Sequence, residues 1–195
     1  MSLDALLRQV RSCTHCTAHL PFPPNPVLRA HPSARLLIIG QAPGTRVHES
    51  GIPWDDPSGD RLRSWLDLSR KVFYDERNVA IIPMGFCYPG KGKSGDLPPQ
   101  PECAPLWHSK LHAYLPNIAL TLLIGQYAQH YYLRDTCKET LTDTVKAWKT
   151  YGKDGFFPLV HPSPRNQHWL KQNPWFEKDV VPELQRKISK LLERK

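Results

Sequence analysis

The sequence lacks the features of a membrane protein, a secreted disulfide-linked fold or a repeat protein. No apolar run approaches the roughly 20 residues that span a bilayer, and we find neither an internal repeat nor a low-complexity tract. No signal peptide is visible, so we expect a cytoplasmic enzyme that does not engage a membrane. In a reducing compartment, five cysteines argue against a disulfide framework and suggest metal or redox chemistry where they lie close together.

Acidic residues are few relative to basic ones. The 195 residues include 26 lysines and arginines against 18 aspartates and glutamates, a net charge of +8. This charge favours a polyanionic partner such as DNA, because counterions released from phosphates supply much of the affinity. The alternative is that the basic run from Lys187 to Lys195 is only the solvated face of a helix. The length suits one domain over residues 1–195, which we expect to act as a monomer.

Short apolar runs alternate with helical patterns along the chain. This alternation predicts an α/β fold, a three-layer α/β/α sandwich with a central, mostly parallel four-stranded sheet. In such sheets the loops after the carboxyl ends of the strands form the site. The predicted strands are Arg35–Ile39, Asn78–Ile82, Ala119–Ile124 and Phe156–Val160, and the predicted helices are residues 1–13, Ser58–Arg70, Pro101–Tyr114, Gln126–Arg134 and Pro182–Arg194.

A glycine-rich turn, Gly40-Gln41-Ala42-Pro43-Gly44, follows the first predicted strand. Glycines let backbone N–H groups approach a ligand, and Ser58 and Gly59 then begin a helix whose free N–H groups face the same region. The turn is not a phosphate loop, since the Gly-Lys-Ser/Thr ending is missing. An ordinary strand-to-helix turn is the alternative.

Two later loops carry polar groups that could serve a site. Lys91 and Lys93 lie among glycines after the second strand and could contact a DNA backbone, although such a loop is more often a solvated turn. After the fourth strand, His161 could donate a proton or a hydrogen bond to developing charge. Ser163 and Arg165 could reach a phosphate. A purely structural histidine is the alternative.

Four cysteines are spaced as metal ligands could be. Cys13 and Cys16 form a C-x-x-C pair, Cys87 follows a strand, and Cys103 lies in the first turn of a helix. Four thiolates could hold zinc or an iron–sulfur cluster, and spacing alone does not separate the two. Alternatively, all the cysteines are reduced and unrelated, as we expect for Cys137.

Taken in order, these motifs resemble the uracil-DNA glycosylase superfamily, and most closely its iron–sulfur branch, family four. That branch has an amino-terminal C-x-x-C, a glycine-rich turn after a strand, a G-x-P-F stretch, two further cysteines around a proline-rich loop, and a late His-Pro motif. The matches run from about residue 13 to 165 and are Cys13, Cys16, Gly40–Gly44, Gly51–Trp54, Cys87, Cys103 and His161–Pro162.

The resemblance implies how these residues would act. The enzyme would flip a base out of DNA and read it in a pocket, with Trp54 stacked on the base. His161 would hydrogen-bond the base carbonyl and stabilise negative charge as the N-glycosidic bond breaks, and the proline-rich loops and Ser163 would hold phosphates. The four cysteines would bind a structural [4Fe–4S] cluster. The implied base-pocket residues are Gly40, Ala42, Pro43, Gly44, Trp54, Pro83 and Ser163, and the implied DNA contacts are Lys91, Lys93 and Arg165.

The chain departs from the family pattern at its carboxylates. Gln41 replaces the family-four glutamate, Ala42 stands where the best-known uracil branch has its catalytic aspartate, and Pro83 replaces the asparagine that reads uracil. Asp55, Asp56 and Asp60 are candidate substitutes. Asp56 and Asp60 are placed to cap a helix, so our predicted catalytic residues are His161, Gln41 and Asp55.

Three functions remain open from the sequence. The first is a DNA glycosylase acting on a deaminated or damaged base. The second is a protein of the same fold that binds lesions without cutting, suggested by the missing carboxylate and asparagine. The third is a zinc- or cluster-bearing hydrolase unrelated to DNA.

Overall fold

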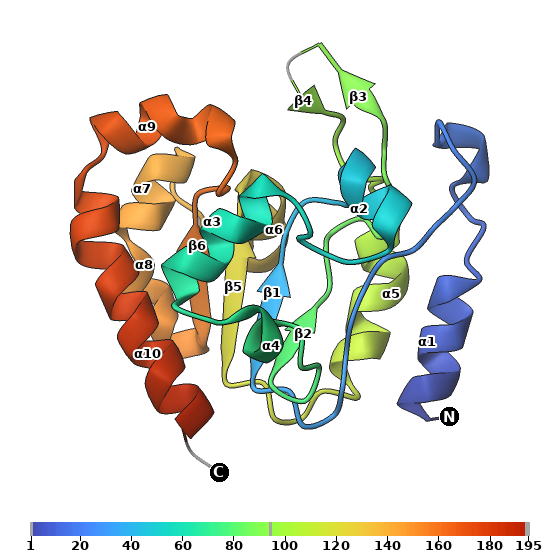
Figure 1. Ribbon diagram of the computed structural model, residues 1–195, viewed down its shortest axis with the longest axis horizontal. Coiled ribbons are helices and arrows are strands. Elements are labelled where there is room, and N and C mark those ends of the chain that lie inside the picture. The colour runs from blue at the N-terminus through green and yellow to red at the C-terminus, as the bar shows by residue number, and fades with distance from the viewer. Residues whose placement is uncertain (1, 94, 194–195) are drawn as a thin grey trace.

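A parallel sheet of four strands forms the centre of the computed structural model, which describes residues 2–93 and 95–193 (Figure 1). The strand order is β2-β1-β5-β6, and every neighbouring pair is parallel. This confirms the predicted α/β fold, and each strand begins and ends within one residue of its predicted limits. The strands are β1 (Leu36–Ile39), β2 (Val79–Ile81), β5 (Leu120–Ile124) and β6 (Phe156–Leu159).

Alternating side chains of the sheet face two separate layers of helices. In β1, Leu36 and Ile38 pack into one apolar core, while Leu37 and Ile39 pack into the other. All four are fully buried, as expected of a strand covered on both faces. The first core includes residues of α3 (Pro57–Leu66), α7 (Leu141–Lys146), α8 (Trp148–Tyr151), α9 (Gln167–Gln172) and α10 (Val181–Glu193), and the second includes residues of α1 (Leu3–Arg11), α5 (Cys103–His112) and α6 (Gln126–Leu133).

The predicted helix Ser58–Arg70 is in fact two helices. The first, α3, starts at the N-cap Asp56, whose carboxylate accepts a hydrogen bond from the Gly59 amide at 2.7 Å. It ends at Asp67, whose backbone is left-handed with φ of 51°. The side chain of Ser69 then caps the short helix α4 (Arg70–Phe73). A helical hydrophobic pattern does not reveal this interruption, because the pattern continues across it.

The other predicted helices are confirmed with small shifts of their ends. The helix predicted over Pro101–Tyr114 is α5, which is shorter at both ends, and the helix predicted at residues 1–13 is α1, capped by Ser2. The helix predicted over Pro182–Arg194 is α10, and two residues of the predicted helices, Met1 and Arg194, lie outside the described residues.

Two small elements that the sequence did not predict lie beyond the carboxyl ends of β1 and β2. Helix α2 (Thr45–Ser50) follows the glycine-rich turn directly, with Gly44 as its N-cap. Strands β3 (Lys91–Gly92) and β4 (Gly95–Asp96) pair as an antiparallel hairpin. Both lie at the end of the sheet toward which β1 points (Figure 1). The loops predicted to form a site are therefore gathered at one edge.

Replacing Gly59 by alanine should destabilise the protein, although alanine is the better helix former by about 1 kcal/mol. A Cβ at this position would lie 1.7 Å from the carbonyl oxygen of Trp54. We expect a net loss of roughly 1–3 kcal/mol in the free energy of unfolding, measured by urea denaturation. The matched control is Gly152→Ala, where a Cβ meets nothing within 4 Å. Equal stability of the two variants would contradict the packing described here.

Candidate active site

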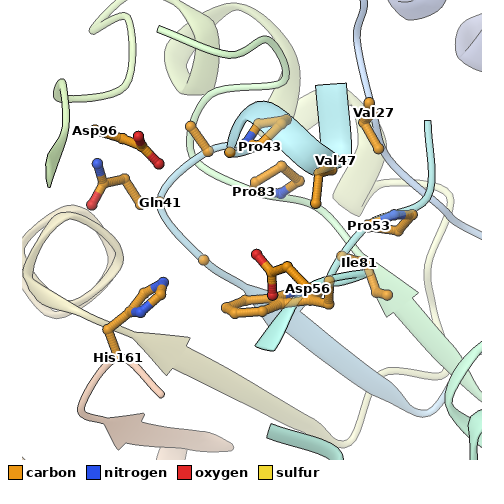
Figure 2. A pocket seen from close by; sticks show the side chains of 14 residues that line it. Val27, Gln41, Pro43, Val47, Pro53, Asp56, Ile81, Pro83, Asp96 and His161 are labelled. Carbon is orange, nitrogen blue, oxygen red and sulfur yellow. The ribbon is translucent and has the colours of Figure 1, made fainter. Parts of the chain in front are cut away.

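Loops that follow β1, β2 and β6 line one pocket. They bring together Gln41, Trp54 and His161, which are far apart in the sequence. Figure 2 shows Asp56, Asp96 and His161 arranged around the same space. The lining residues are Val27, Gly40, Gln41, Ala42, Pro43, Gly44, Val47, Pro53, Trp54, Asp56, Ile81, Pro83, Asp96 and His161.

Backbone hydrogen bonds tie the glycine-rich turn to the loop after β2. The carbonyl oxygens of Gly40 and Gln41 accept from the amides of Met84 and Gly85, each at 2.9 Å. The Gln41 side-chain amide donates to the carbonyl oxygen of Leu97 at 2.9 Å. Gln41 therefore uses its side chain to hold the β3–β4 hairpin against the turn.

Trp54 forms one wall of the pocket in a strained backbone conformation. Its φ is 59°, which is costly for a bulky residue. Its carbonyl oxygen accepts from the Arg63 guanidinium at 3.1 Å and from the Tyr74 hydroxyl at 3.2 Å. The indole lies so close to Gly40 that a Cβ there would be 2.8 Å from Cζ2 of the ring. Glycine is thus needed at position 40, because any side chain there would displace the indole of Trp54.

The cation that supports Trp54 is buried. Arg63 is 6% exposed, and its guanidinium also bonds the Asp60 carboxylate and the Tyr74 hydroxyl. It lies over the rings of Phe73 and Tyr74 at 5.3 and 5.6 Å. Asp60 therefore pairs with a structural arginine, away from the pocket.

His161 is neutral, and its free N–H is on the Nε2 atom. Its Nδ1 accepts a hydrogen bond from the Ser163 amide at 3.2 Å. Burial lowers the pKa of His161 to about 4, although nearby Asp56 acts in the opposite direction. Since a backbone amide can only donate, Nδ1 carries no proton and Nε2 does. The ring centroid lies 5.5 Å from that of Trp54, so this N–H is a donor beside an aromatic wall.

Two carboxylates of the described residues line the pocket, those of Asp56 and Asp96, and the predicted Asp55 is not one of them. Asp55 pairs with Arg70 at 2.9 Å and does not line the pocket. Asp56, the next residue, caps α3 and also lines the pocket, so capping and a role in the site are compatible. Asp96, at the end of the hairpin, is a second lining carboxylate. Burial raises the pKa of Asp96 and nearby Asp56 raises it further, whereas Arg165 and Lys91 act in the opposite direction.

The predicted phosphate-contacting residues lie around the pocket. Ser163 positions His161 through its amide and caps the Arg165 amide through its hydroxyl at 3.2 Å, and it does not line the pocket. Lys91 and Lys93 are exposed on the hairpin. The Arg165 guanidinium lies against Gly95, where a Cβ would be 2.7 Å from Nη1. The hairpin and the His161 loop are therefore in contact.

A buried hydrogen-bonded chain supports Pro83 from behind. His108 Nε2 donates to the Pro83 carbonyl oxygen at 3.0 Å, and burial lowers the pKa of His108 to about 4. In a neutral ring, Nδ1 must then accept from the Tyr132 hydroxyl at 2.6 Å. The Tyr132 oxygen in turn accepts from His112 Nε2 at 2.8 Å. The direction of every bond follows from the Pro83 carbonyl, which can only accept.

The four predicted cysteine ligands line a second, separate pocket, whereas Cys137 does not. Burial raises the pKa of Cys87 to about 11 and that of Cys103 to about 12, which argues against a low-pKa redox thiolate at these positions. In residues 2–93 and 95–193, no group of three or more His, Cys, Asp or Glu side chains is placed to hold a metal ion.

Thiolates that share one zinc ion each lie about 2.3 Å from it, and the four cysteines are not arranged in that way. In a cluster each iron binds its own thiolate, which requires a wider ring of cysteines around a cavity. Four cysteine side chains around one pocket are a donor set that fits a thiolate-bound cluster.

Comparison with known proteins relates the fold to a family. The family model of the uracil DNA glycosylase superfamily matches residues 29–185. A type-4 uracil-DNA glycosylase from Sulfurisphaera tokodaii is 25% identical over 171 residues, covering 83% of this chain and 74% of that protein. The family match includes Gln41, Trp54 and His161, and it begins after Cys13 and Cys16. Within the described residues, no helix is long and apolar enough to cross a bilayer.

Sequence reasoning missed Asp96 and the apolar lining residues Val27, Val47 and Ile81. Val47 belongs to α2 and Asp96 to the hairpin, neither of which the sequence predicted. The one available signal was the Gly95-Asp96 pair, which is typical of turns and does not indicate where the carboxylate points.

Lowering the pH should destabilise the fold between about 6.5 and 4. Burial lowers the pKa of His161 and His108 to about 4, from a usual value of 6.5. Because the unfolded chain binds more protons in this window, the free energy of unfolding falls as the pH falls. We expect a loss on the order of 1–2 kcal/mol per histidine at pH 5 relative to pH 7, measured by urea denaturation.

The variant His161→Gln should show a weaker pH dependence than the wild type, because one of the buried histidines with a lowered pKa is gone. His31→Gln is the matched control, since His31 is exposed and lies before β1. A His161→Gln profile as steep as that of the wild type would refute a neutral buried imidazole.

Proposed function

Since this chain belongs to the uracil DNA glycosylase superfamily, we propose that it is a DNA glycosylase that hydrolyses the N-glycosidic bond of a damaged base flipped out of DNA. The observation that carries the proposal is the convergence of the glycine-rich turn, Trp54 and His161 on one pocket. A base inside a duplex is unreachable, so a concave site with an aromatic wall is what the chemistry needs.

The pocket has the groups needed to bind and polarise a base. The indole of Trp54 stacks on one face of the base. The Nε2–H of His161 donates to an acceptor atom on its edge, and this bond strengthens as electron density moves onto the base. The Ser163 amide fixes the imidazole in the required tautomer. Neutral His161 donates without the cost of burying a charge.

A carboxylate is needed to accept the proton of the attacking water. We assign this role to Asp56 in place of Asp55, because Asp55 is paired with Arg70 outside the pocket. One Asp56 oxygen accepts the Gly59 amide, which orients the side chain. The N–C1′ electron pair leaves with the base, water adds at C1′ of the sugar, and its proton passes to Asp56.

The basic surface around the pocket would hold the DNA backbone. Lys91, Lys93 and Arg165 come from the hairpin and from the loop after His161. The net charge of +8 agrees with a polyanionic partner.

A second candidate function is lesion binding without cleavage. Ala42 leaves the turn without a carboxylate, and Pro83 lines the pocket where family four has an asparagine. A protein of this kind would still bind a flipped base against Trp54.

We further propose that Cys13, Cys16, Cys87 and Cys103 hold a [4Fe–4S] cluster, which would join the segment after α1 to the loop after β2 and to the start of α5. When bound, such a group would stabilise the fold and take no part in breaking the N-glycosidic bond. Its support is the shared pocket of the four cysteines and the resemblance to the iron–sulfur branch.

Protein purified without oxygen should be brown and should contain iron. Cys103→Ser should lose the visible absorbance and the iron, because one ligand is removed, whereas Cys137→Ser should keep both. Metal analysis and absorption spectra measure this. A colourless wild type that contains zinc or no metal would refute the cluster.

The enzymatic proposal is tested by measuring abasic-site formation on DNA with uracil, hypoxanthine, xanthine or an N-methylated purine. We expect product from at least one lesion, and His161→Ala should reduce that rate by about 10²–10³-fold. His31→Ala is the control. Lesion binding by folded protein with no product from any DNA would favour the second candidate, and a near-normal rate for His161→Ala would show that His161 is structural.

A further inference from the structure

The pocket is acidic although the chain is basic. The protein carries a net charge of +8, yet the charged side chains that line the pocket are two aspartates, Asp56 and Asp96, and no lysine or arginine is among the described lining residues. His161 adds no positive charge at neutral pH. The sign of the charge therefore reverses between the surface expected to meet phosphates and the cavity expected to meet the base.

Asp96 is held at the pocket by contacts with the glycine-rich turn. Its Oδ2 occupies the space beside Gly44, where a Cβ would be 3.4 Å away. The next residue, Leu97, accepts the Gln41 side-chain amide at 2.9 Å. Lys91 is the strand partner of Asp96 in the hairpin, and Arg165 and Lys91 both act to lower the pKa of Asp96, but neither lines the pocket. The carboxylate thus lies against the turn that borders the cavity.

These groups suit a positively charged base better than uracil. Uracil presents carbonyl oxygens on its edge and departs as an anion, and both features are disfavoured by a second carboxylate, Asp96, in addition to the one that accepts the proton of the water. A purine alkylated on a ring nitrogen is cationic, stacks favourably on an indole, and offers amino N–H donors to a carboxylate. The reader asparagine of the uracil enzymes is replaced by Pro83, which offers no side-chain hydrogen bond.

We propose that the pocket takes a cationic, N-alkylated purine, and that Asp96 is the residue that selects it. This inference rests on the proposed glycosylase function and specifies its substrate class. When the N-glycosidic bond breaks, its electron pair cancels the positive charge of the purine, which leaves as a neutral base. Water adds at C1′ and gives its proton to Asp56. No base anion has to be stabilised beside the carboxylates.

The test compares three DNA duplexes, which carry one 7-methylguanine, one uracil or one hypoxanthine. Release of the base is measured under single-turnover conditions, and the release without enzyme is subtracted. We expect 7-methylguanine to be released at least 10-fold faster than either neutral base. Asp96→Asn, which keeps the shape and removes the charge, should reduce that ratio at least 10-fold. The matched control is Asp135→Asn, which removes an exposed carboxylate and should leave the ratio unchanged.

A binding measurement separates charge from shape. DNA with 7-methyl-7-deazaguanine has the same outline as the 7-methylguanine duplex but no positive charge. We expect the wild type to bind the cationic duplex at least 10-fold more tightly, and Asp96→Asn to lose most of this difference.

Faster release of uracil or hypoxanthine, with a ratio that Asp96→Asn does not change, overturns the inference and leaves the glycosylase proposal intact. Release of no base overturns the glycosylase proposal. The binding measurement then decides the inference, because equal affinity for the charged and uncharged duplexes overturns it.

Discussion

The carbonyl oxygen of Trp54 is the point on which the pocket depends. A left-handed backbone at a tryptophan is unfavourable, and it persists here because Arg63 and Tyr74 both donate to that oxygen. Gly59 leaves room for the carbonyl, and Gly40 leaves room for the indole. Since Arg63 is buried, the loss of Asp60, its charged partner, would leave an uncompensated charge in the core. Arg63, Tyr74 and Gly59 therefore hold the aromatic wall in place without lining the pocket themselves.

The charged side chains that line the pocket differ in sign from the net charge of the chain. The chain carries a net charge of +8, which favours a polyanionic partner, whereas the pocket is lined by Asp56 and Asp96 and by an uncharged imidazole. Two carboxylates repel a base that leaves as an anion and attract a base that carries a positive charge. In the specificity proposed for this chain, the charge inside the cavity, more than the fold, selects the substrate.

The sheet and the site were not equally predictable from the sequence. The four strands were recognised because continuous apolar runs are typical of parallel strands covered on both faces. The convergence of Gln41, Trp54 and His161 followed from the same argument, since parallel strands end at one edge. The break between α3 and α4 was missed because Asp67 interrupts a helical pattern that continues on both sides. Helix α2 and the β3–β4 hairpin were too short to give a periodic signal.

By itself, the sequence determined the fold class, the family and the edge of the sheet at which the site lies, because hydrophobic periodicity and ordered motifs are local properties of the chain. Tertiary structure alone decided which carboxylates enter the pocket. Asp55 and Asp56 are neighbours, but the turn into α3 directs one to Arg70 and the other to the cavity. Asp96 reaches the same cavity from a hairpin that contacts Gln41. The direction of a side chain depends on backbone angles and on hydrogen bonds between residues that are far apart in the sequence. Neither can be inferred from the order of the residues alone.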